Sequence, residues 1–244
     1  MRLLFSIIFT ITALSGCAKK GDDNNTPVTI DMNNKDTTTV AADSLSYLAL
    51  GDSYTIGEAV PASESFPHQL SIGLTLQKHP IKTPKIIAVT GWTTDNLISA
   101  IDRSGLTGKK YDFVTLLIGV NDQFQHVSQD NYKIKFAQVL NTAITFANGD
   151  KTRVFVLSIP DYGVTPFAGG NEASIGPEID QFNAINKDIS TKAGVNYLDI
   201  TGISRQAATD PSLIANDGLH PSPKMYQLWV EQLLPMITAK LKVN

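Results

Sequence analysis

The chain has a single cysteine, Cys17, and only four histidines among its 244 residues. One cysteine cannot form a disulfide within the chain, whatever the redox state of its compartment. A metal site needs several histidine, cysteine or carboxylate ligands that converge on one point. Because only one histidine, His220, belongs to a group of reactive residues, the sequence predicts no bound metal and no cofactor.

The signatures of nucleotide binding are also absent. Neither the phosphate-binding pattern Gly-x4-Gly-Lys-Ser/Thr nor the dinucleotide pattern Gly-x-Gly-x-x-Gly occurs in the chain. The formal net charge is -3, and no basic cluster with interleaved aromatic residues is present. Neither nucleotides nor nucleic acids are therefore expected as partners.

The first residues have the pattern of an export signal. Met1-Arg2 is followed by an apolar run from Leu3 to Leu14, which is too short to span a bilayer and closes with small residues. We therefore expect a signal peptide over residues 1–16. Leu14-Ser15-Gly16-Cys17 resembles the bacterial lipobox, which implies cleavage before Cys17 and lipidation of Cys17. The alternative is an ordinary signal peptide with an incidental cysteine.

The resemblance to a lipobox also implies a location. A lipoprotein of this kind crosses the inner membrane and is held by its lipid at the outer membrane, on the periplasmic or the cell-surface face. Residues 18–43 contain almost no large apolar side chains, so they cannot bury enough surface to offset the entropy of ordering. We expect residues 17–43 to be a lipidated, flexible tether and residues 44–244 to be one domain.

Short apolar runs alternate with segments of helical period in this domain, which is typical of an α/β fold with a parallel sheet between two layers of helices. The predicted strands are 47–50, 85–89, 113–118, 154–158 and 196–198. Two predicted helices have apolar stripes, formed by Tyr132, Phe136, Val139, Leu140 and Ile144 and by Ile175, Ile179, Phe182, Ile185 and Ile189. A last helix is predicted over 222–240, with a kink at Pro235.

Reactive residues follow several of the predicted strands. Ser53 follows the first strand, Gly91 the second and Asn121 the third, and Asp217 and His220 lie between the fifth strand and the last helix. Ligands of such sheets bind beyond the carboxyl ends of the strands. We therefore expect these five residues to lie at one edge of the sheet.

Acyl transfer needs this set of groups. A serine hydroxyl attacks an ester only if a base takes its proton, so Ser53 is the predicted nucleophile and His220 the base. Asp217 can orient the imidazole of His220. The backbone N–H groups of Ser53 and Gly91 and the side-chain amide of Asn121 can donate to an oxyanion. Asp52 is expected to brace the loop rather than to react.

Four segments together resemble the SGNH hydrolases, also called GDSL-type esterases and lipases. They are Gly51-Asp52-Ser53-Tyr54, the turn at Gly91, Gly119-Val120-Asn121-Asp122 and Asp217-Gly218-Leu219-His220. The resemblance implies a flavodoxin-like three-layer α/β/α sandwich whose five parallel strands are ordered 2-1-3-4-5. An α/β-hydrolase is disfavoured, because Ser53 lacks the Gly-x-Ser-x-Gly context and the acid and base share one loop.

The resemblance implies a carboxylic ester hydrolase, and the choice of substrate stays open. Short acyl esters or acylated glycans are one option, and lysophospholipids or thioesters are another. A non-catalytic carbohydrate- or lipid-binding module is the alternative outside the enzymes. Asp161, Tyr162 and His126 are candidate substrate contacts, and 165–174 is a candidate rim of the site.

Overall fold

The computed structural model describes residues 44–241, apart from the side chain of Glu172. The expected signal peptide, Cys17 and the tether lie outside these described residues. Within them, no helix combines the length and apolar character that crossing a bilayer requires.

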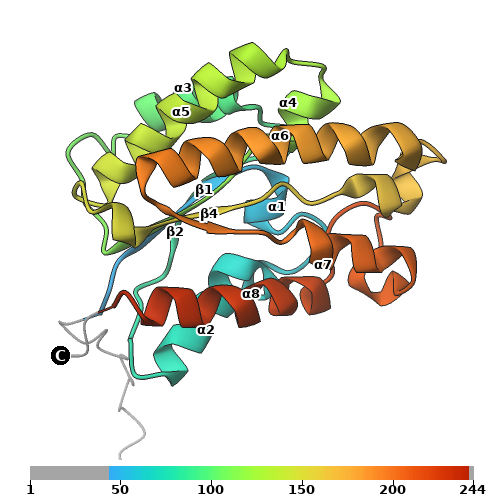
Figure 1. Ribbon diagram of the computed structural model, residues 1–244. Coiled ribbons are helices and arrows are strands. Elements are labelled where there is room, and N and C mark those ends of the chain that lie inside the picture. The colour runs from blue at the N-terminus through green and yellow to red at the C-terminus, as the bar shows by residue number, and fades with distance from the viewer. Residues whose placement is uncertain (1–43, 242–244) are drawn as a thin grey trace, which may run out of the picture. The chain divides into compact units, whose positions relative to one another are not determined.

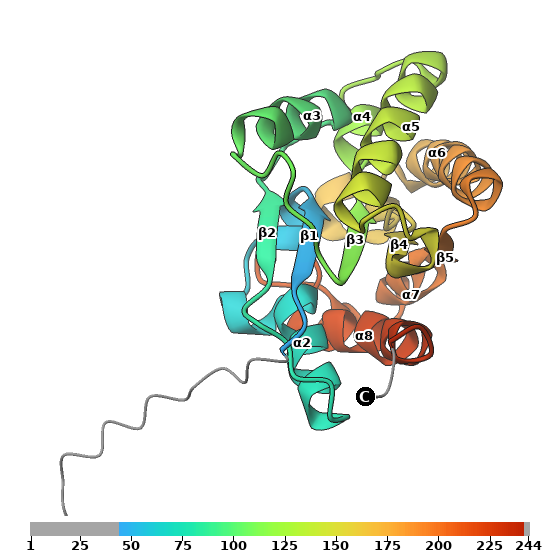
Figure 2. The same ribbon diagram turned by 90° about the vertical axis from the view of Figure 1, so that its left-hand side faces the viewer.

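Five parallel strands form one sheet in the order β2-β1-β3-β4-β5 (Figure 2). Their bounds are β1 Tyr47–Gly51, β2 Lys85–Ala88, β3 Phe113–Leu117, β4 Val154–Leu157 and β5 Asn196–Leu198. Every residue of β1, β3 and β4 is buried, as their continuous apolar sequences predict for strands covered on both faces. The strand order confirms the order that the resemblance implied, and each predicted strand is present to within one residue at its end.

Helices cover both faces of this sheet (Figures 1 and 2). One layer contains α3 Thr94–Arg103, α5 Gln129–Phe146 and α6 Glu172–Ala193, and the other contains α2 Phe66–Leu76 and α8 Pro223–Thr238. Shorter helices are α1 Ser53–Ile56, α4 Val120–Phe124 and α7 Thr201–Arg205, with 3-10 turns at Ala62–Glu64, Lys151–Arg153, Tyr162–Val164 (η3), Pro166–Ala168 (η4), Gln206–Ala208 and Pro211–Leu213. The predicted three-layer sandwich is confirmed.

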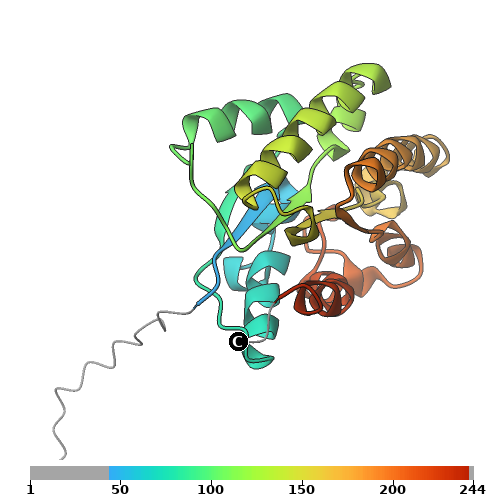
Figure 3. The same cartoon turned by 60° about the vertical axis from the view of Figure 1, so that its left-hand side comes forward.

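Aromatic side chains join each helical layer. The ring of Trp229 in α8 lies 6.2 Å from that of Phe66 in α2, and the ring of Tyr132 in α5 lies 4.7 Å from that of Phe182 in α6. The views in Figures 1 and 3 show the same pairing of α2 with α8. Ser222 caps α8 by accepting a hydrogen bond from Met225 N–H, and α8 continues past Pro235 to Thr238.

Two glycines let the chain pass closely at the carboxyl edge of the sheet. A Cβ atom at Gly51 would lie 2.0 Å from Thr55 Oγ1 and 2.4 Å from the carbonyl oxygen of Leu117. Gly119 has a φ of 127°, and a Cβ atom there would lie 2.2 Å from the hydroxyl of Tyr132. Only glycine therefore fits at the two points where the chain passes from β1 into α1 and from β3 into α4.

Two buried carboxyl groups lie beneath this edge. Asp52 is fully buried and caps α1, where its Oδ1 accepts a hydrogen bond from Tyr54 N–H at 3.0 Å. Burial raises the pKa of Asp52 to about 8, the Tyr54 hydrogen bond opposes this change, and the Asp122 carboxylate adds to it. Burial also raises the pKa of Asp122 to about 6, although Thr94 donates hydrogen bonds to both of its oxygens. Asp52 therefore braces the loop, as expected.

The raised pKa of Asp52 predicts that stability falls as the pH rises. Between the ordinary pKa of 3.8 and about 8, the folded state keeps a proton that the unfolded state has released, so the free energy of unfolding decreases with pH. Asp122 contributes in the same direction only up to about pH 6. Asp52→Asn retains an acceptor for Tyr54 N–H and removes the titration. We expect urea unfolding to show a smaller loss of stability from pH 6 to pH 8 in this variant than in the parent.

The control for this measurement is Asp188→Asn, which removes an exposed carboxylate that pairs with Lys192 on the surface of α6. This variant should retain the pH dependence of the parent. An equal loss of stability in Asp52→Asn and in the parent would show that Asp52 is ionised in the folded protein.

Candidate active site

A cavity of about 110 Å³ opens at the carboxyl edge of the sheet. It brings together four of the residues singled out from the sequence, Ser53, Gly91, Asn121 and His220. The remaining lining residues are Tyr54, Thr90, Val120, Phe124, Tyr162, Phe167 and Leu219. The cavity therefore collects residues from five separate segments, as parallel strands that end at one edge predict.

His220 is held by Asp217, three residues earlier in the same loop. Asp217 Oδ2 lies 2.5 Å from Nδ1 of the His220 ring, while Asp217 Oδ1 accepts hydrogen bonds from the backbone N–H groups of Leu219 and His220, each at 3.0 Å. Burial acts to raise the pKa of Asp217, but the hydrogen bonds from His220 and Leu219 outweigh it, so the pKa lies below its ordinary value. Asp217 is thus held as a carboxylate against the imidazole.

The loop that carries this pair is closed by its own backbone. Ala215 N–H donates to the carbonyl oxygen of His220 at 2.8 Å, and Gly218 N–H donates to the carbonyl oxygen of Ala215 at 3.0 Å. Gly218 has a φ of 75°, which places the turn in a left-handed conformation. The ring of Tyr54 lies 5.2 Å from the His220 ring and supports it from the side of α1. Nδ1 is therefore occupied by Asp217, and Nε2 is the ring nitrogen left for proton transfer.

Ser53 is the first residue of α1 and is 3% exposed. Asp52 rather than Ser53 caps this helix, so the Ser53 hydroxyl is not used for capping. Among the described residues no hydrogen bond joins the side chains of Ser53 and His220, although both line the same cavity. Catalytic hydrogen bonds commonly tighten only when substrate is bound, so this arrangement is compatible with proton transfer.

Asn121 follows β3 and Gly91 follows β2, so both reach the cavity from segments other than the Asp217 loop. The Asn121 side-chain amide donates one hydrogen bond to the carbonyl oxygen of Trp92 at 3.0 Å. Since an amide NH₂ group has two donors, this bond fixes the group and leaves its second N–H for another acceptor. Gly91 has a φ of 82° and open space around its Cα, so its backbone can be approached by a ligand.

Three aromatic side chains form a wall of the cavity. Phe124, Tyr162 and Phe167 contact one another with ring centroids 6.1 to 6.3 Å apart. Tyr162 was a candidate from the sequence, whereas Phe124 was assigned no role and Phe167 was included only as part of the candidate rim at 165–174. Phe124 follows Asn121 by three residues, and Phe167 lies in the predicted rim at 165–174, so their proximity to reactive residues was the only available signal.

The other two candidate contacts do not line this cavity. Asp161 is 4% exposed, and its carboxylate accepts hydrogen bonds from Gly163 N–H at 2.8 Å and from Nε of Arg205 at 2.9 Å. These contacts make Asp161 a support for η3, which carries Tyr162. His126 lines a neighbouring cavity of about 250 Å³ that shares Phe124, Tyr162 and Phe167 with the first. Asp161 thus lies outside the active-site cavity, where it supports the segment that carries Tyr162. His126 lines only the neighbouring cavity.

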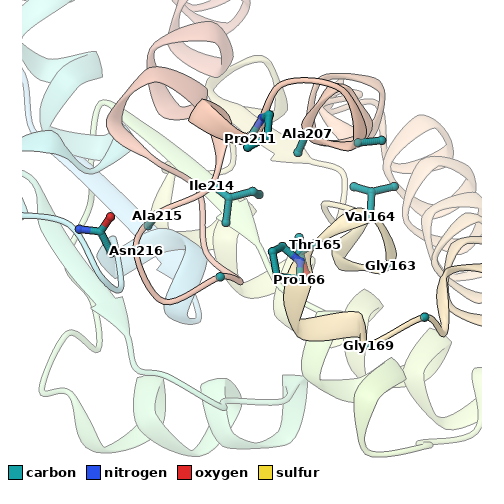
Figure 4. A pocket seen from close by; sticks show the side chains of 13 residues that line it. Gly163, Val164, Thr165, Pro166, Gly169, Ala207, Pro211, Ile214, Ala215 and Asn216 are labelled. Atoms are coloured by element: carbon teal, nitrogen blue, oxygen red, sulfur yellow. The ribbon is translucent and has the colours of Figure 1, made fainter.

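A larger cavity of about 720 Å³ lies between the rim and the segment before the Asp217 loop (Figure 4). Its lining is mostly small or apolar and includes neither Ser53 nor His220; the labelled residues are Gly163, Val164, Thr165, Pro166, Gly169, Ala207, Pro211, Ile214, Ala215 and Asn216. A hydrogen bond from Phe167 N–H to the Gly218 carbonyl oxygen, 3.0 Å long, crosses between these two segments. The smaller cavity, which holds the reactive groups, is therefore the candidate active site.

Within residues 44–241, no group of three or more histidine, cysteine or acidic side chains is arranged to hold a metal ion. The candidate catalytic groups at the active-site cavity include the hydroxyl of Ser53, the imidazole of His220 and the amide of Asn121. These groups suit proton transfer and the stabilisation of an oxyanion.

Comparisons with known proteins bear on the family and the fold. The profile of the GDSL-like Lipase/Acylhydrolase family matches residues 49–228, a range that begins in β1 and ends in α8. No curated protein matches the chain.

Several solved structures share the fold at low sequence identity. The structure of TesA has a TM-score of 0.65 at 16% identity over 80% of this chain and 99% of that chain. The psychrotrophic esterase EstA from Pseudoalteromonas sp. has a TM-score of 0.62 at 16% identity over 81% and 98%. Axe2, an acetylxylan esterase from Geobacillus stearothermophilus, has a TM-score of 0.61 at 17% identity over 79% and 94%.

The family profile covers all four segments that carry the resemblance, strands β2 to β5 and the last three residues of β1. The chain therefore belongs to the GDSL-like lipase/acylhydrolase family, and it is a serine hydrolase that acts on ester bonds.

Proposed function

We propose that the protein hydrolyses carboxylic esters of short acyl chains or acylated glycans through an acyl-enzyme on Ser53. The observation that carries this proposal is the cavity that Ser53 shares with Gly91, Asn121 and the Asp217-bound His220. Each of these residues matches one requirement of acyl transfer, namely a nucleophile, oxyanion donors, and a base with an orienting acid.

The reaction has two steps. In the first, Ser53 Oγ attacks the ester carbonyl while His220 Nε2 takes the hydroxyl proton, and the tetrahedral intermediate then collapses as His220 returns this proton to the departing alcohol. In the second, water attacks the acyl-enzyme, with His220 taking a proton from the water and returning it to Ser53. Asp217 fixes the His220 tautomer and stabilises the imidazolium formed in each step.

The oxyanion is stabilised by preorganised donors. The backbone N–H groups of Ser53 and Gly91 and the free N–H of the Asn121 amide can converge on the carbonyl oxygen that becomes negative. Because Trp92 already holds the Asn121 amide, little reorganisation is needed when the charge develops. A neutral amide also avoids the repulsion that a carboxylate at this position would exert on an oxyanion.

The size of the cavity supports a short acyl group. A volume of about 110 Å³ is well below the roughly 300–1,000 Å³ of pockets that enclose drug-sized ligands. Aromatic and aliphatic side chains, among them Phe124, Tyr162 and Leu219, provide its apolar surface. An acetyl group or a similarly short chain therefore suits this cavity better than a long fatty acyl chain.

We also propose that Cys17 carries a lipid and holds the enzyme at a membrane surface outside the cytoplasm. The lipobox-like run Leu14-Ser15-Gly16-Cys17 after an apolar segment supports this proposal. A lipid anchor would bring the esterase to substrates outside the inner membrane.

Radiolabelled palmitate should be incorporated into the full-length chain, and Cys17→Ser should abolish the label if the proposal holds.

Ser53→Ala and His220→Ala test the proposed chemistry. Either change should lower kcat for p-nitrophenyl acetate by about 10⁴-fold or more, because the nucleophile and its base act as one unit. A fluorophosphonate probe should label the parent, and Ser53→Ala should abolish this labelling. Ser63→Ala, which alters an exposed serine in Ala62–Glu64, is the control and should react with the probe as the parent does. Esterase activity that persists in Ser53→Ala would disprove the assignment.

Asp217→Asn isolates the orienting role of the carboxylate. An asparagine retains an oxygen for the N–H groups of Leu219 and His220, so the loop should keep its backbone bonds. It cannot stabilise the imidazolium and favours the wrong ring tautomer. We expect kcat to fall about 10⁴-fold, as such a change does in other triads. A loss below tenfold, with the fold intact by circular dichroism, would mean that Asp217 has no catalytic part.

Asn121→Ala tests the oxyanion donor. Removing one such donor typically lowers kcat by about 10² to 10³-fold. The loss should appear in kcat rather than in KM, because the donor acts on charge that develops in the transition state. Thermal unfolding of the same variant separates this effect from the loss of the Asn121 to Trp92 hydrogen bond. An unchanged kcat would remove Asn121 from the oxyanion hole.

A further inference from the structure

Two phenylalanines at the active site are unusually exposed. Phe124 is 51% exposed and Phe167 is 52% exposed, while most large apolar side chains of the described residues are buried. Their ring centroids lie 6.1 Å apart, and both rings contact Tyr162. Exposed aromatic rings that border a site usually mark a contact surface for a ligand.

Two cavities share this aromatic wall. The active-site cavity of about 110 Å³ and the neighbouring cavity of about 250 Å³ share Phe124, Tyr162 and Phe167. An ester whose carbonyl lies at Ser53 has two parts that leave in different directions, the acyl group and the alcohol. The neighbouring cavity is therefore placed to receive the part that the smaller cavity does not hold.

The neighbouring cavity is lined by different polar residues from those of the active-site cavity. Its polar residues are Gln123, His126, Asn171, Ser174 and Glu178. Tyr162 donates to Gln123 Oε1 at 2.9 Å, and Gln123 Nε2 donates to Glu178 Oε2 at 2.8 Å. This chain of hydrogen bonds fixes the Glu178 carboxylate beside the wall. In the described part of the chain, its second oxygen accepts no hydrogen bond from the protein.

The polar lining decides between the ligand classes. A fatty acyl chain in this cavity would cover the Glu178 carboxylate and the amides without replacing their bonds to water, which is costly. A sugar ring offers hydroxyl groups that both donate and accept, and its C–H face can lie against an aromatic ring. The combination of exposed rings, a carboxylate, amides and a hydroxyl therefore fits a polyhydroxylated alcohol.

We propose that the cavity bordered by Phe124, Phe167 and Glu178 is a sugar-binding subsite for the alcohol part of the substrate. This inference rests on the proposed esterase function. The acetyl or other short acyl group occupies the cavity at Ser53, and the sugar that carries it lies over the exposed rings with its hydroxyl groups toward Glu178. Specificity for acylated carbohydrates thus arises from residues outside the catalytic group.

The test compares two kinds of acetyl ester. Methyl 6-O-acetyl-glucoside and methyl 2-O-acetyl-xyloside carry one acetyl group on a sugar that keeps its other hydroxyl groups free, and p-nitrophenyl acetate carries the same acyl group on a flat apolar alcohol. The measured quantity is the ratio of kcat/KM for each sugar ester to kcat/KM for p-nitrophenyl acetate. Using a ratio removes any common effect of a variant on the chemical step.

Two variants address the two parts of the subsite. Phe124→Leu keeps an apolar side chain but removes the flat ring, and Glu178→Gln keeps the shape of the side chain but removes the charge. Glu178→Gln should lower the ratio about tenfold, which is the scale of one hydrogen bond to a charged group. Phe124→Leu should also lower the ratio, because the sugar loses the flat ring against which its C–H face lies. The loss should come mainly from KM for the sugar esters. The controls are Ile134→Ala on the exposed face of α5 and Asp188→Asn on α6, whose ratios should match that of the parent.

The outcomes separate this inference from the proposed function. If the parent hydrolyses p-nitrophenyl acetate through Ser53 but both variants keep the parental ratio with both sugars, the subsite is wrong and the esterase stands. If Phe124→Leu instead changes only the preference for p-nitrophenyl octanoate over acetate, the wall binds an acyl chain and the subsite is again wrong. A parent that cleaves no ester would overturn the proposed function itself.

Discussion

Strand β1 hydrogen-bonds to β2 on one side and to β3 on the other, with Gly51 paired to Ala88 and to Leu117. This double pairing places the carboxyl ends of β2, β1 and β3 next to one another in the sheet. Ser53 follows β1, and it lies between the turn that carries Gly91 and the turn that carries Asn121. Because a Cβ atom at Gly51 would collide with Thr55 and with the Leu117 carbonyl, the arrangement requires glycine where β1 ends. The active-site cavity depends on this close passage.

Three aspartates at the same edge have different protonation behaviour for local reasons. Asp217 accepts hydrogen bonds from the His220 ring and from two backbone N–H groups, and its pKa is lowered. Asp52 is fully buried, accepts one backbone hydrogen bond and has a pKa of about 8, while Asp122, held by Thr94, has a pKa of about 6. Burial and the number of donors, rather than residue type, therefore determine which carboxyl group can stabilise an imidazolium.

The proposed sugar subsite is built from segments that lie far apart in the sequence. Phe124 comes from α4, Tyr162 and Phe167 come from η3 and η4, and Glu178 comes from α6. Arg205 holds Asp161 and so anchors the start of η3, although neither residue lines the reactive cavity. The same wall borders the cavity at Ser53 and the more polar one, so a single group of rings shapes both. This sharing explains how short acyl groups and bulky alcohols could be distinguished at one site.

The sequence by itself determined the secondary-structure elements and indicated the candidate reactive groups. Continuous apolar runs specified the buried strands, and the apolar stripes through Tyr132 and Ile179 specified α5 and α6, because these periodicities follow from local backbone geometry. The four short segments around Ser53, Gly91, Asn121 and His220 identified the family and implied the strand order. The structure confirmed that order.

Only the tertiary structure decided which side chains share a cavity. Asp161 and Tyr162 are neighbours in sequence, yet the carboxylate turns to Arg205 and the ring lines the cavity at Ser53. The exposure of the Phe124 and Phe167 rings likewise depends on how α4, η4 and α6 pack. The same packing determines that only one carboxylate oxygen of Glu178 accepts a hydrogen bond from the described residues. Local patterns carry no information on such long-range contacts, since the side chains that meet are separated by tens of residues and are brought together only when the helices dock on the sheet.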